Sequence, residues 1–384
     1  MTLWAVLCFP VFFFPSAYML SRSLRYSVLA AALVTFLGPT LRCLPLWFPS
    51  LPGFTLLCHI GAFINGVGGP INMAAPIQIS AAWFPPHERT RATSIGQMFN
   101  ALGVGVSYVL GNVVVSRNIS DESDTETAEH YIMILLSIYS AVGAAIFIFI
   151  LIYFPSSPPS PPSISASEER TKFREGWLDV VRNRNCWLLT LTYALSGGLV
   201  QMWQSTMVIL LTDPHLDLGL SETWCSTLGI AVSFSAVLAS IVIATLMDYF
   251  RKKMKLALIF LLSFSGVVCV ISTLITEKII IFEDSSMFKL FLYILFILGV
   301  SLACAASPIA FEFCVELCFP VSEGILGNWL VLWFNTLAAL YFGVSQIPDL
   351  GNRWMNFILP GATLASILPV ILIKEQYKRS KLDD

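Results

Sequence analysis

The stretch of sequence that decides the fold occurs twice. Residues 84–102 read FPPHERTRATSIGQMFNAL, and residues 319–337 read FPVSEGILGNWLVLWFNTL. Six of the 19 positions match at a constant offset of 235 residues, whereas about one match is expected at average composition. Each copy runs from the end of one apolar stretch, through a short polar loop, into the next apolar stretch. This internal repeat predicts two halves of similar architecture.

The sequence around the repeat is strongly apolar. Hydrophobic residues make up 56% of the 384 residues, charged residues make up 12%, and the mean hydropathy is +0.77. Because soluble domains carry about 25% charged residues, this composition excludes a disordered chain, a secreted disulfide scaffold and an ordinary soluble enzyme. The net charge of −2 gives no basis for nucleic-acid binding. A polytopic membrane protein is predicted.

Eleven apolar stretches are long enough to cross the hydrocarbon core as helices, which takes about 20 residues each. They lie at residues 3–20, 26–47, 54–83, 94–116, 131–154, 187–211, 226–248, 256–275, 288–317, 325–345 and 357–373. The alternating pattern of porin strands is absent, so we predict an all-α polytopic fold. An odd number of spans that starts at Met1 further predicts that the first of twelve helices is missing.

Basic residues orient the spans. When the loops are numbered alternately, 17 of the 22 Lys and Arg residues fall on one side and four on the other, while Arg42 lies inside the second span. The positive-inside rule assigns the richer side, and with it the C-terminal tail, to the cytosol. On that side, the basic run 251–255 is a candidate contact for anionic membrane lipid.

A polar stretch at residues 155–186 divides the chain. It opens with the proline-rich residues 155–162, which favour a stiff spacer. Ser165-x-x-Glu168 then has the spacing of a helix-capping box, and residues 169–184 are predicted to form a short amphipathic helix on the cytosolic surface. The predicted organisation is an N-terminal bundle of five spans (1–154), the linker (155–186), a C-terminal bundle of six spans (187–374) and a cytosolic tail (375–384).

Two loop motifs resemble those of the major facilitator superfamily. Phe84–Arg89 resembles the loop between its fourth and fifth helices, and Leu246–Lys253 resembles its gating loop, an Asp followed by basic residues. In the first-half copy of the gating loop, Ser21 stands where Asp is expected, which argues against a full charge latch there.

Further motifs are similar to solute carrier family 49. They are Ala81–Phe84, Tyr153-Phe154-Pro155, Phe311-Glu312-Phe313 with Val315-Glu316, and Pro320-Val321-x-Glu323-Gly324. The resemblance implies two pseudo-repeated helical bundles that transport a small organic solute by alternating access. Choline and haem are implied by one branch of the family. The branch that this chain resembles most implies a lysosomal membrane protein with pyridoxine as a proton-coupled substrate; the plasma membrane is the alternative location. A membrane receptor or regulator that keeps the fold without transporting is the rival interpretation.

Acidic side chains inside the ninth span are the strongest candidates for proton coupling. Glu312 and Glu316 lie four residues apart and therefore on one face of a helix. Charged groups are costly inside a membrane and tend to face the interior of a bundle, where a carboxyl can bind a cation or carry a proton. For Glu312 the alternative is a structural hydrogen bond to a neighbouring helix. For Glu316 the alternatives are snorkelling to the cytosolic surface and pairing with a basic loop residue. His59, near the outer end of the third span, is a further candidate proton relay.

Polar and aromatic side chains within the spans are candidates for binding the solute. An amide can hydrogen-bond a hydroxyl or a ring nitrogen without burying charge, and an aromatic ring can stack on a ring or hold a cation. The candidates are Gln97, Asn100, Tyr193, Gln201, Trp203, Asn328 and Asn335. Contacts between helices are the alternative role of the amides. Gly197-Gly198, just before the cluster around Trp203, are expected to loosen the helix.

Two acid–base pairs at the cytosolic face are predicted to act as gate latches. They are Asp248 with Arg251 and Glu88 with Arg89; ordinary solvated loop charge is the alternative. On the outer side, the sequon that begins at Asn118 is a candidate glycosylation site.

No cofactor, metal site or enzyme chemistry is predicted. His87-Glu88 lacks the second His of a zinc-protease helix, and no Gly-rich phosphate loop follows a strand. The nine cysteines lie mostly in or beside apolar spans without metal-ligand spacing, so we interpret them as small packing residues. Cys43 and Cys58 both lie near the outer face, which would allow a disulfide.

Overall fold

The computed structural model describes residues 2–48, 54–111, 113–114, 125–347 and 350–383, which contain helices and no strand. The first half consists of α1 (Thr2–Arg22), α2 (Leu24–Trp47), α3 (Phe54–Trp83), α4 (Arg89–Gly111) and α5 (Thr125–Tyr153). The linker carries α6 (Ile164–Ser167) and α7 (Phe173–Arg182). The second half consists of α8 (Arg184–Tyr193), the π-helical turn η2 (Ala194–Leu199), α9 (Val200–Leu211), α10 (Glu222–Tyr249), the short turn η3 (Arg251–Lys253), α11 (Met254–Thr276), α12 (Ser285–Cys318), α13 (Glu323–Val344), α14 (Arg353–Ala365) and α15 (Ile367–Leu372), and α16 (Ser380–Asp383) ends the tail.

The predicted all-helical fold is confirmed, and a helix lies at each of the eleven predicted spans. The sixth span consists of α8, η2 and α9 together, and the eleventh consists of α14 and α15. Within the described ranges, eight of the eleven are long and apolar enough to cross a membrane; α1, α3 and α4 are not among them. The count of eleven spans therefore stays a prediction.

Polar residues at the helix starts explain where several helices begin. The Ser221 hydroxyl accepts the N–H of Trp224 at 3.2 Å, and the Asp284 carboxylate accepts the N–H of Ser286 at 2.7 Å. Each cap satisfies a first-turn donor that has no partner inside its helix. Further along the chain, Gly197-Gly198 lie inside η2, which confirms that the helix is loosened where the sequence predicted it.

The predicted capping box in the linker is wrong. The N-cap of α6 is Ser163, whose hydroxyl accepts the N–H of Ala166 at 3.2 Å, and the helix ends before Glu168. The Ser165 hydroxyl instead donates to Asp383 at 2.7 Å, so a tertiary contact takes the group that the local pattern assigned to a cap.

The amphipathic linker helix is present as α7, four residues later than its predicted start. Its Trp177 ring lies 5.1 Å from the ring of Phe13 in α1 and 5.2 Å from the ring of Trp329 in α13. Aromatic pairs at such distances are favourable packing contacts. The linker helix is therefore held against both halves.

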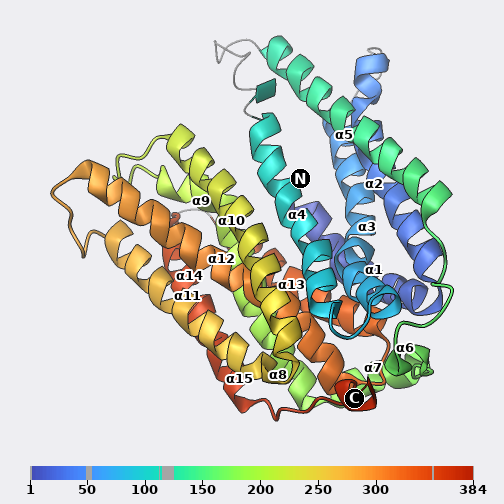
Figure 1. Cartoon of the computed structure of the whole chain (residues 1–384). Coiled ribbons are helices and arrows are strands. Elements are labelled where there is room, and N and C mark those ends of the chain that lie inside the picture. The colour runs from blue at the N-terminus through green and yellow to red at the C-terminus, as the bar shows by residue number, and fades with distance from the viewer. Residues whose placement is uncertain (1, 49–53, 112, 115–124, 348–349, 384) are drawn as a thin grey trace.

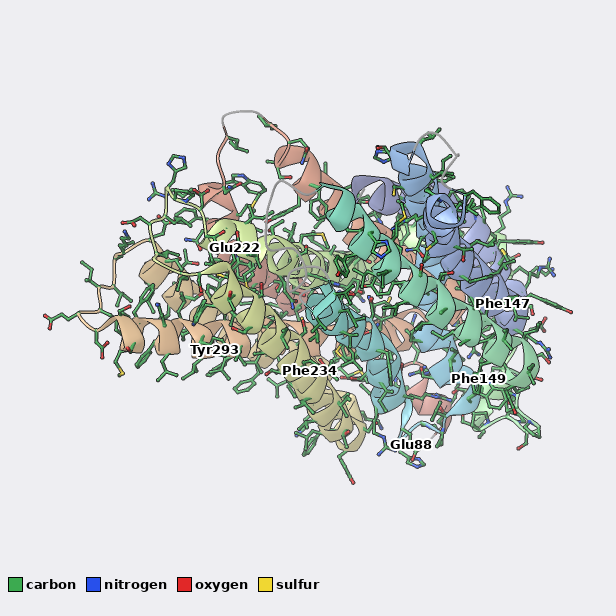
Figure 2. All side chains as sticks on the ribbon, turned by 90° about the horizontal axis from the view of Figure 1, so that it is seen from above. Glu88, Phe147, Phe149, Glu222, Phe234 and Tyr293 are labelled. Carbon is green, nitrogen blue, oxygen red and sulfur yellow. The ribbon has the colours of Figure 1, made fainter. Side chains whose placement is uncertain are left out.

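The helices form two bundles that meet at one end (Figure 1). α4 packs against α10 and α12, while α1 and α3 pack against α13. The bundles come together at the end that holds α6, α7 and the C-terminus, and they diverge toward the other end. From above, Phe147 and Phe149 mark the outer edge of the first bundle, and Tyr293 lies on the opposite flank (Figure 2). The end where the bundles meet is the one that basic residues assign to the cytosol.

Candidate functional site

The carboxylates predicted for proton coupling lie at the interface between the bundles. Glu312 and Glu316, both in α12, are 0% and 2% exposed. Glu312 Oε1 accepts the Thr93 hydroxyl at 2.6 Å and the Ser80 hydroxyl at 3.3 Å. Thr93 belongs to α4 and Ser80 to α3. One carboxylate of the second bundle therefore holds two helices of the first.

The other oxygen of Glu312 meets the C-terminal tail. Arg379 Nη2 lies 2.6 Å from Glu312 Oε2, and Arg379 Nε lies 3.4 Å from Glu316 Oε1. Burial alone disfavours the charged guanidinium, but the two carboxylates outweigh it and raise the pKa of Arg379 above its ordinary value. The neighbouring Ser380 adds a hydroxyl bond of 2.7 Å and a backbone N–H bond of 3.1 Å to Glu316. Glu316 thus pairs with a basic residue, as one alternative predicted, but the partner lies in the C-terminal tail and not in a loop.

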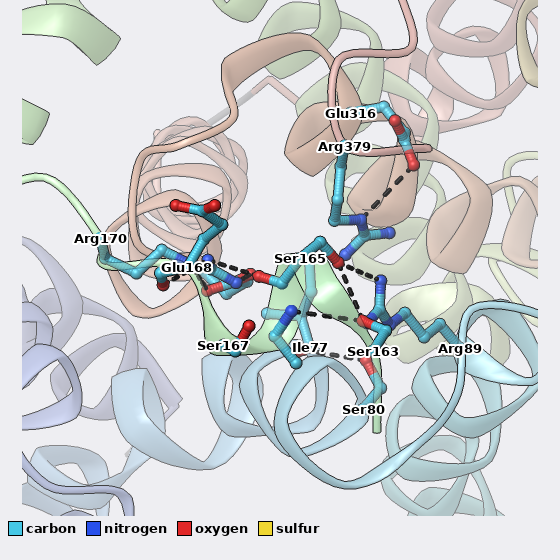
Figure 3. A network of polar contacts seen from close by, with 12 residues as sticks. Ile77, Ser80, Arg89, Ser163, Ser165, Ser167, Glu168, Arg170, Glu316 and Arg379 are labelled. Carbon is cyan, nitrogen blue, oxygen red and sulfur yellow. Dashed lines mark hydrogen bonds and ion pairs between the residues drawn. The ribbon is translucent and has the colours of Figure 1, made fainter. Parts of the chain in front are cut away.

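Arg89, at the start of α4, is held by the linker (Figure 3) and also by the tail. Its Nη2 donates to the Ser163 hydroxyl at 2.6 Å, and its Nη1 donates to the Ser165 hydroxyl at 3.1 Å. Nη1 also lies 3.2 Å from Asp383 Oδ2. Although burial works in the opposite direction, hydrogen bonds from Ser165 and the charge of Arg89 hold the pKa of Asp383 below its usual range.

The predicted pairing of Glu88 with Arg89 is wrong. Glu88 Oε1 accepts from Arg91 Nη2 at 2.9 Å instead, and both side chains are partly exposed. Residues three apart at a helix start share a face, whereas adjacent residues point apart. Arg89 therefore turns into the interface while Glu88 stays at the surface.

Asp248 makes a second contact between the bundles. Its two carboxylate oxygens accept the backbone N–H groups of Thr90 and Arg91, each at 3.0 Å. These first-turn donors of α4 have no partner inside the helix, and a helix N-terminus favours negative charge. The end of α10 thereby caps α4. The predicted partner, Arg251, has a side chain that lies outside the described residues.

The network is rich in charge. Glu323, at the start of α13, forms a two-point ion pair with Arg170 of the linker, with N–O distances of 2.7 and 3.0 Å. Three guanidinium groups and five carboxylates thus gather at the cytosolic end, which leaves a net charge of −2. The guanidinium groups are those of Arg89, Arg170 and Arg379, and the carboxylates are those of Asp248, Glu312, Glu316, Glu323 and Asp383.

A groove of about 350 Å³ opens beside this network, between α3 and α4. Its lining is mainly apolar and includes Ile79 and Phe99, with Asn72 and Ser80 as polar groups. Ser80 belongs to both features, because its hydroxyl also reaches Glu312. The volume lies within the range of about 300–1,000 Å³ that is common for small-molecule sites.

The predicted aromatic ligands of the solute are packed inside the second bundle. Trp203 is fully buried with its ring 4.9 Å from that of Phe296, and Tyr193 is buried with its ring 4.9 Å from that of Phe311. Gln201 is half-buried. Their role in binding stays a prediction.

The predicted amides have different surroundings. Asn328 is buried and accepts the Ser16 hydroxyl of α1 at 2.6 Å, so it bridges the bundles. Asn335 is buried and donates to the Val331 carbonyl at 2.9 Å. Gln97 is half-buried and Asn100 is exposed. No hydrogen bond between described residues joins any of these four amides to Glu312 or Glu316.

Other predicted residues lie away from the network. His59 is half-buried in α3, Cys43 and Cys58 are free thiols, and Asn118 lies outside the described residues. The sulfur atoms of Cys186, Cys314 and Cys318 come within 4.8 Å of one another, a grouping that could hold a soft metal ion. These three residues also belong to one buried apolar cluster, so packing explains them equally well.

Sequence reasoning missed most partners of Glu312. Ser80 and Thr93 are small hydroxyl residues with no motif of their own. Arg379 and Asp383 of the tail likewise belong to no motif. One feature of the sequence could have indicated these partners. The tail at residues 375–384 is short, follows the last span and carries basic and acidic residues, Arg379 and Asp383 among them.

The Major Facilitator Superfamily model matches residues 1–323. The chain is 28% identical to the "Solute carrier family 49 member 4 homolog" of Xenopus laevis, across 100% of this chain and 84% of that protein. It is 24% identical to the human "Choline/ethanolamine transporter FLVCR2", across 99% of this chain and 72% of that protein. The predicted resemblance to the superfamily and to solute carrier family 49 is confirmed.

Solved structures share the fold. The transporter FucP in its outward conformation superposes with a TM-score of 0.70 at 13% identity, across 97% of this chain and 89% of that one. A double-Trp mutant of XylE superposes with a TM-score of 0.65 at 16% identity, across 99% and 88%. At such identities the likeness concerns the architecture of the two bundles.

Proposed function

This chain belongs to the Major Facilitator Superfamily, and we propose that it is a secondary-active transporter that moves a small organic solute across a membrane by alternating access. Its relatives and its fold are those of transporters, not of enzymes. The observation that carries the proposal is the network at one end of the bundle interface, where Glu312 and Asp248 of the second bundle hold α3 and α4 of the first. In this account, the network closes the cytosolic side while the helices diverge at the other side (Figure 1).

The proposed substrate is an organic cation, with a vitamin-like solute such as pyridoxine as the alternative. Several relatives bear the name choline/ethanolamine transporter, and the net charge of −2 in the network favours a positive ligand. The groove beside Ser80 has the volume for a small molecule. We propose that the seven polar and aromatic residues predicted from the sequence also contact the solute as it crosses the membrane. They are Gln97, Asn100, Tyr193, Gln201, Trp203, Asn328 and Asn335.

Proton coupling is proposed to reside in Glu312 and Glu316, with His59 as an accessory relay. When the cytosolic end opens, Arg379 leaves the two carboxylates. Two unpaired, buried carboxylates cannot both stay charged at low cost, so one takes a proton or a cation. The lysosomal membrane is the proposed location, with the plasma membrane as the alternative, and glycosylation at Asn118 is proposed on the luminal side.

Uptake into proteoliposomes tests this function. Radiolabelled choline, ethanolamine and pyridoxine are presented with and without a pH gradient, to wild type and to Glu312→Gln. We expect saturable uptake that responds to the gradient in wild type, and loss of the pH response in Glu312→Gln. Glu222→Gln is the matched control, because Glu222 is exposed at the start of α10. A receptor that keeps the fold would bind a solute and show no flux, which would contradict the proposal.

A further inference from the structure

The C-terminal tail folds back under the cytosolic end of the bundles. After α15, the Tyr377 hydroxyl accepts the N–H of Met254 at 3.0 Å, and the N–H of Lys378 donates to the Glu316 carbonyl at 3.2 Å. Arg379 and Ser380 are 3% and 7% exposed. Residues 375–383, which follow the last span, thus return to the interface instead of extending into solvent (Figure 1).

Arg379 enters a site built from side chains of both bundles. Glu312 presents one oxygen to Arg379 and the other to the hydroxyls of Ser80 and Thr93. Glu316, one turn further along α12, presents an oxygen to the same guanidinium. The guanidinium therefore sits in a buried, negatively charged pocket, in the way that a separate cationic ligand would.

The fit of Arg379 in this pocket is incomplete. The Nε bond to Glu316 is long, at 3.4 Å, and the buried Nη1 has no hydrogen-bond partner among the described residues. A buried donor without a partner costs stability. Arg89, whose positive charge lies close enough to oppose that of Arg379, adds to this cost. Because Arg379 has an unsatisfied donor and a like charge nearby, another cation can take its place.

The far end of the tail is bound to the first bundle and the linker. Asp383 pairs with Arg89 of α4, and its carboxylate accepts the N–H and the hydroxyl of Ser165 at 2.9 and 2.7 Å. The tail follows the second bundle in the chain, so it spans the interface from Glu316 to Arg89. The bundles cannot separate at this end unless the tail releases one of its two contacts.

We propose that Glu312 and Glu316 form a cation-binding site that the chain's own tail fills with Arg379 while the cytosolic end is closed, and that a guanidinium or ammonium ligand from the cytosol occupies when the tail withdraws. The exchange of Arg379 for another ligand rests on the proposed function, because it requires the cytosolic end to open. Occupancy of the site by the tail is independent of transport.

Hydrogen exchange of the full-length protein in lipid nanodiscs tests this site, with mass spectrometry of tail peptides as the readout. The N–H groups of Lys378 and Ser380 are bonded to Glu316, so we expect tail amides to exchange at least about tenfold more slowly than in an unstructured peptide. Millimolar methylguanidinium should accelerate this exchange saturably. N-methylurea, a neutral molecule of the same shape, should have no effect.

Two variants sharpen the test. Glu312→Gln with Glu316→Gln should raise tail exchange about tenfold and abolish the response to methylguanidinium. Because that variant removes buried groups, Arg379→Gln provides a second route that leaves the pocket intact: its tail should exchange freely while the pocket binds methylguanidinium more tightly, measured by thermal shift. Arg353→Gln is the control, since the ion pair of Arg353 with Glu277 joins α14 to the end of α11 away from the tail.

Two results would overturn the proposal: a wild-type tail that exchanges as fast as an unstructured peptide, or equal effects of methylguanidinium and N-methylurea. A protected tail in a protein without uptake activity would leave this site standing and remove the transport function. Uptake activity with an unprotected tail would do the reverse.

Discussion

The two copies of the repeated motif place the residues that they share in different surroundings. Phe99 is 67% exposed, whereas its counterpart Phe334 is 4% exposed. Asn100 is exposed, and its counterpart Asn335 is buried. In the same way, Glu88 forms a surface pair, whereas Glu323 forms a pair in which its own side chain is 6% exposed.

The cause of the difference is the helix that covers the second copy. Gly197 and Gly198 of η2 lie directly against Phe334, and the ring of Tyr193 lies 5.4 Å from its ring. The corresponding face of α4 lines the groove, with Phe99 at its wall. A repeat in sequence therefore sets the position of a loop and a helix, while neighbouring helices decide whether each side chain is core or surface.

Replacing Phe99 or Phe334 by alanine should give the largest difference in stability between the two copies. Phe334→Ala leaves a cavity in a packed interface and should destabilise the protein by about 3–5 kcal/mol. Phe99→Ala should change stability by less than about 1 kcal/mol, since little buried area is lost. Thermal unfolding of the purified protein measures both. Equal shifts in the melting temperature would show that the two environments are alike.

Replacing Glu88 or Glu323 by glutamine should give the second largest difference in stability between the two copies. Glu323→Gln breaks a largely buried ion pair, and because Arg170 is itself 21% exposed we expect a loss of about 2 kcal/mol, below the full cost of a buried charge. Glu88→Gln should cost about 0.5 kcal/mol or less, as exposed pairs do. The same unfolding assay in low and high salt gives the comparison. A Glu88 variant as unstable as the Glu323 variant would contradict it.

Replacing glycine by alanine should lower the stability of the protein at Gly198 and raise it at Gly103. A Cβ on Gly198 would lie 3.1 Å from the Phe334 carbonyl oxygen, whereas a Cβ on Gly103 would meet nothing within 4 Å. Gly198→Ala should therefore destabilise by about 1 kcal/mol through crowding. Gly103→Ala should stabilise by up to about 1 kcal/mol through helix propensity. Stabilisation by Gly198→Ala would mean that η2 and α13 are not in close contact.

The smallest expected effect is that of pH on the contact between Asp383 of the tail and Arg89. Because the pKa of Asp383 is lowered in the folded protein, its contact with Arg89 is complete above the ordinary value of about 3.9 and is lost only as the pH falls through the lowered value. Asp383→Asn should therefore accelerate tail exchange by the same factor at pH 5 and pH 7.5, after correction for intrinsic rates. An effect confined to pH 7.5 would contradict this assignment.

Much of the fold could be predicted because hydropathy and helix signals are local. The apolar stretches, the loosened helix at Gly197-Gly198 and the amphipathic linker helix each depend on residues within one segment. The interface network could not be predicted in the same way, because Arg379 meets Glu312 only after both bundles have assembled. The errors at Glu88 and Ser165 share this cause, since each local pattern was overridden by a partner from elsewhere in the chain.

The central claim is that the polar network closes the cytosolic end of two bundles that move against each other. Genetically encoded spin labels at His87 and Tyr249 report it directly, because both residues are exposed at that end, one on each bundle. We predict a single short distance in wild type, and a second, longer population in Glu312→Gln combined with Asp248→Asn. One unchanged distance in both proteins, with or without solute, would contradict the account.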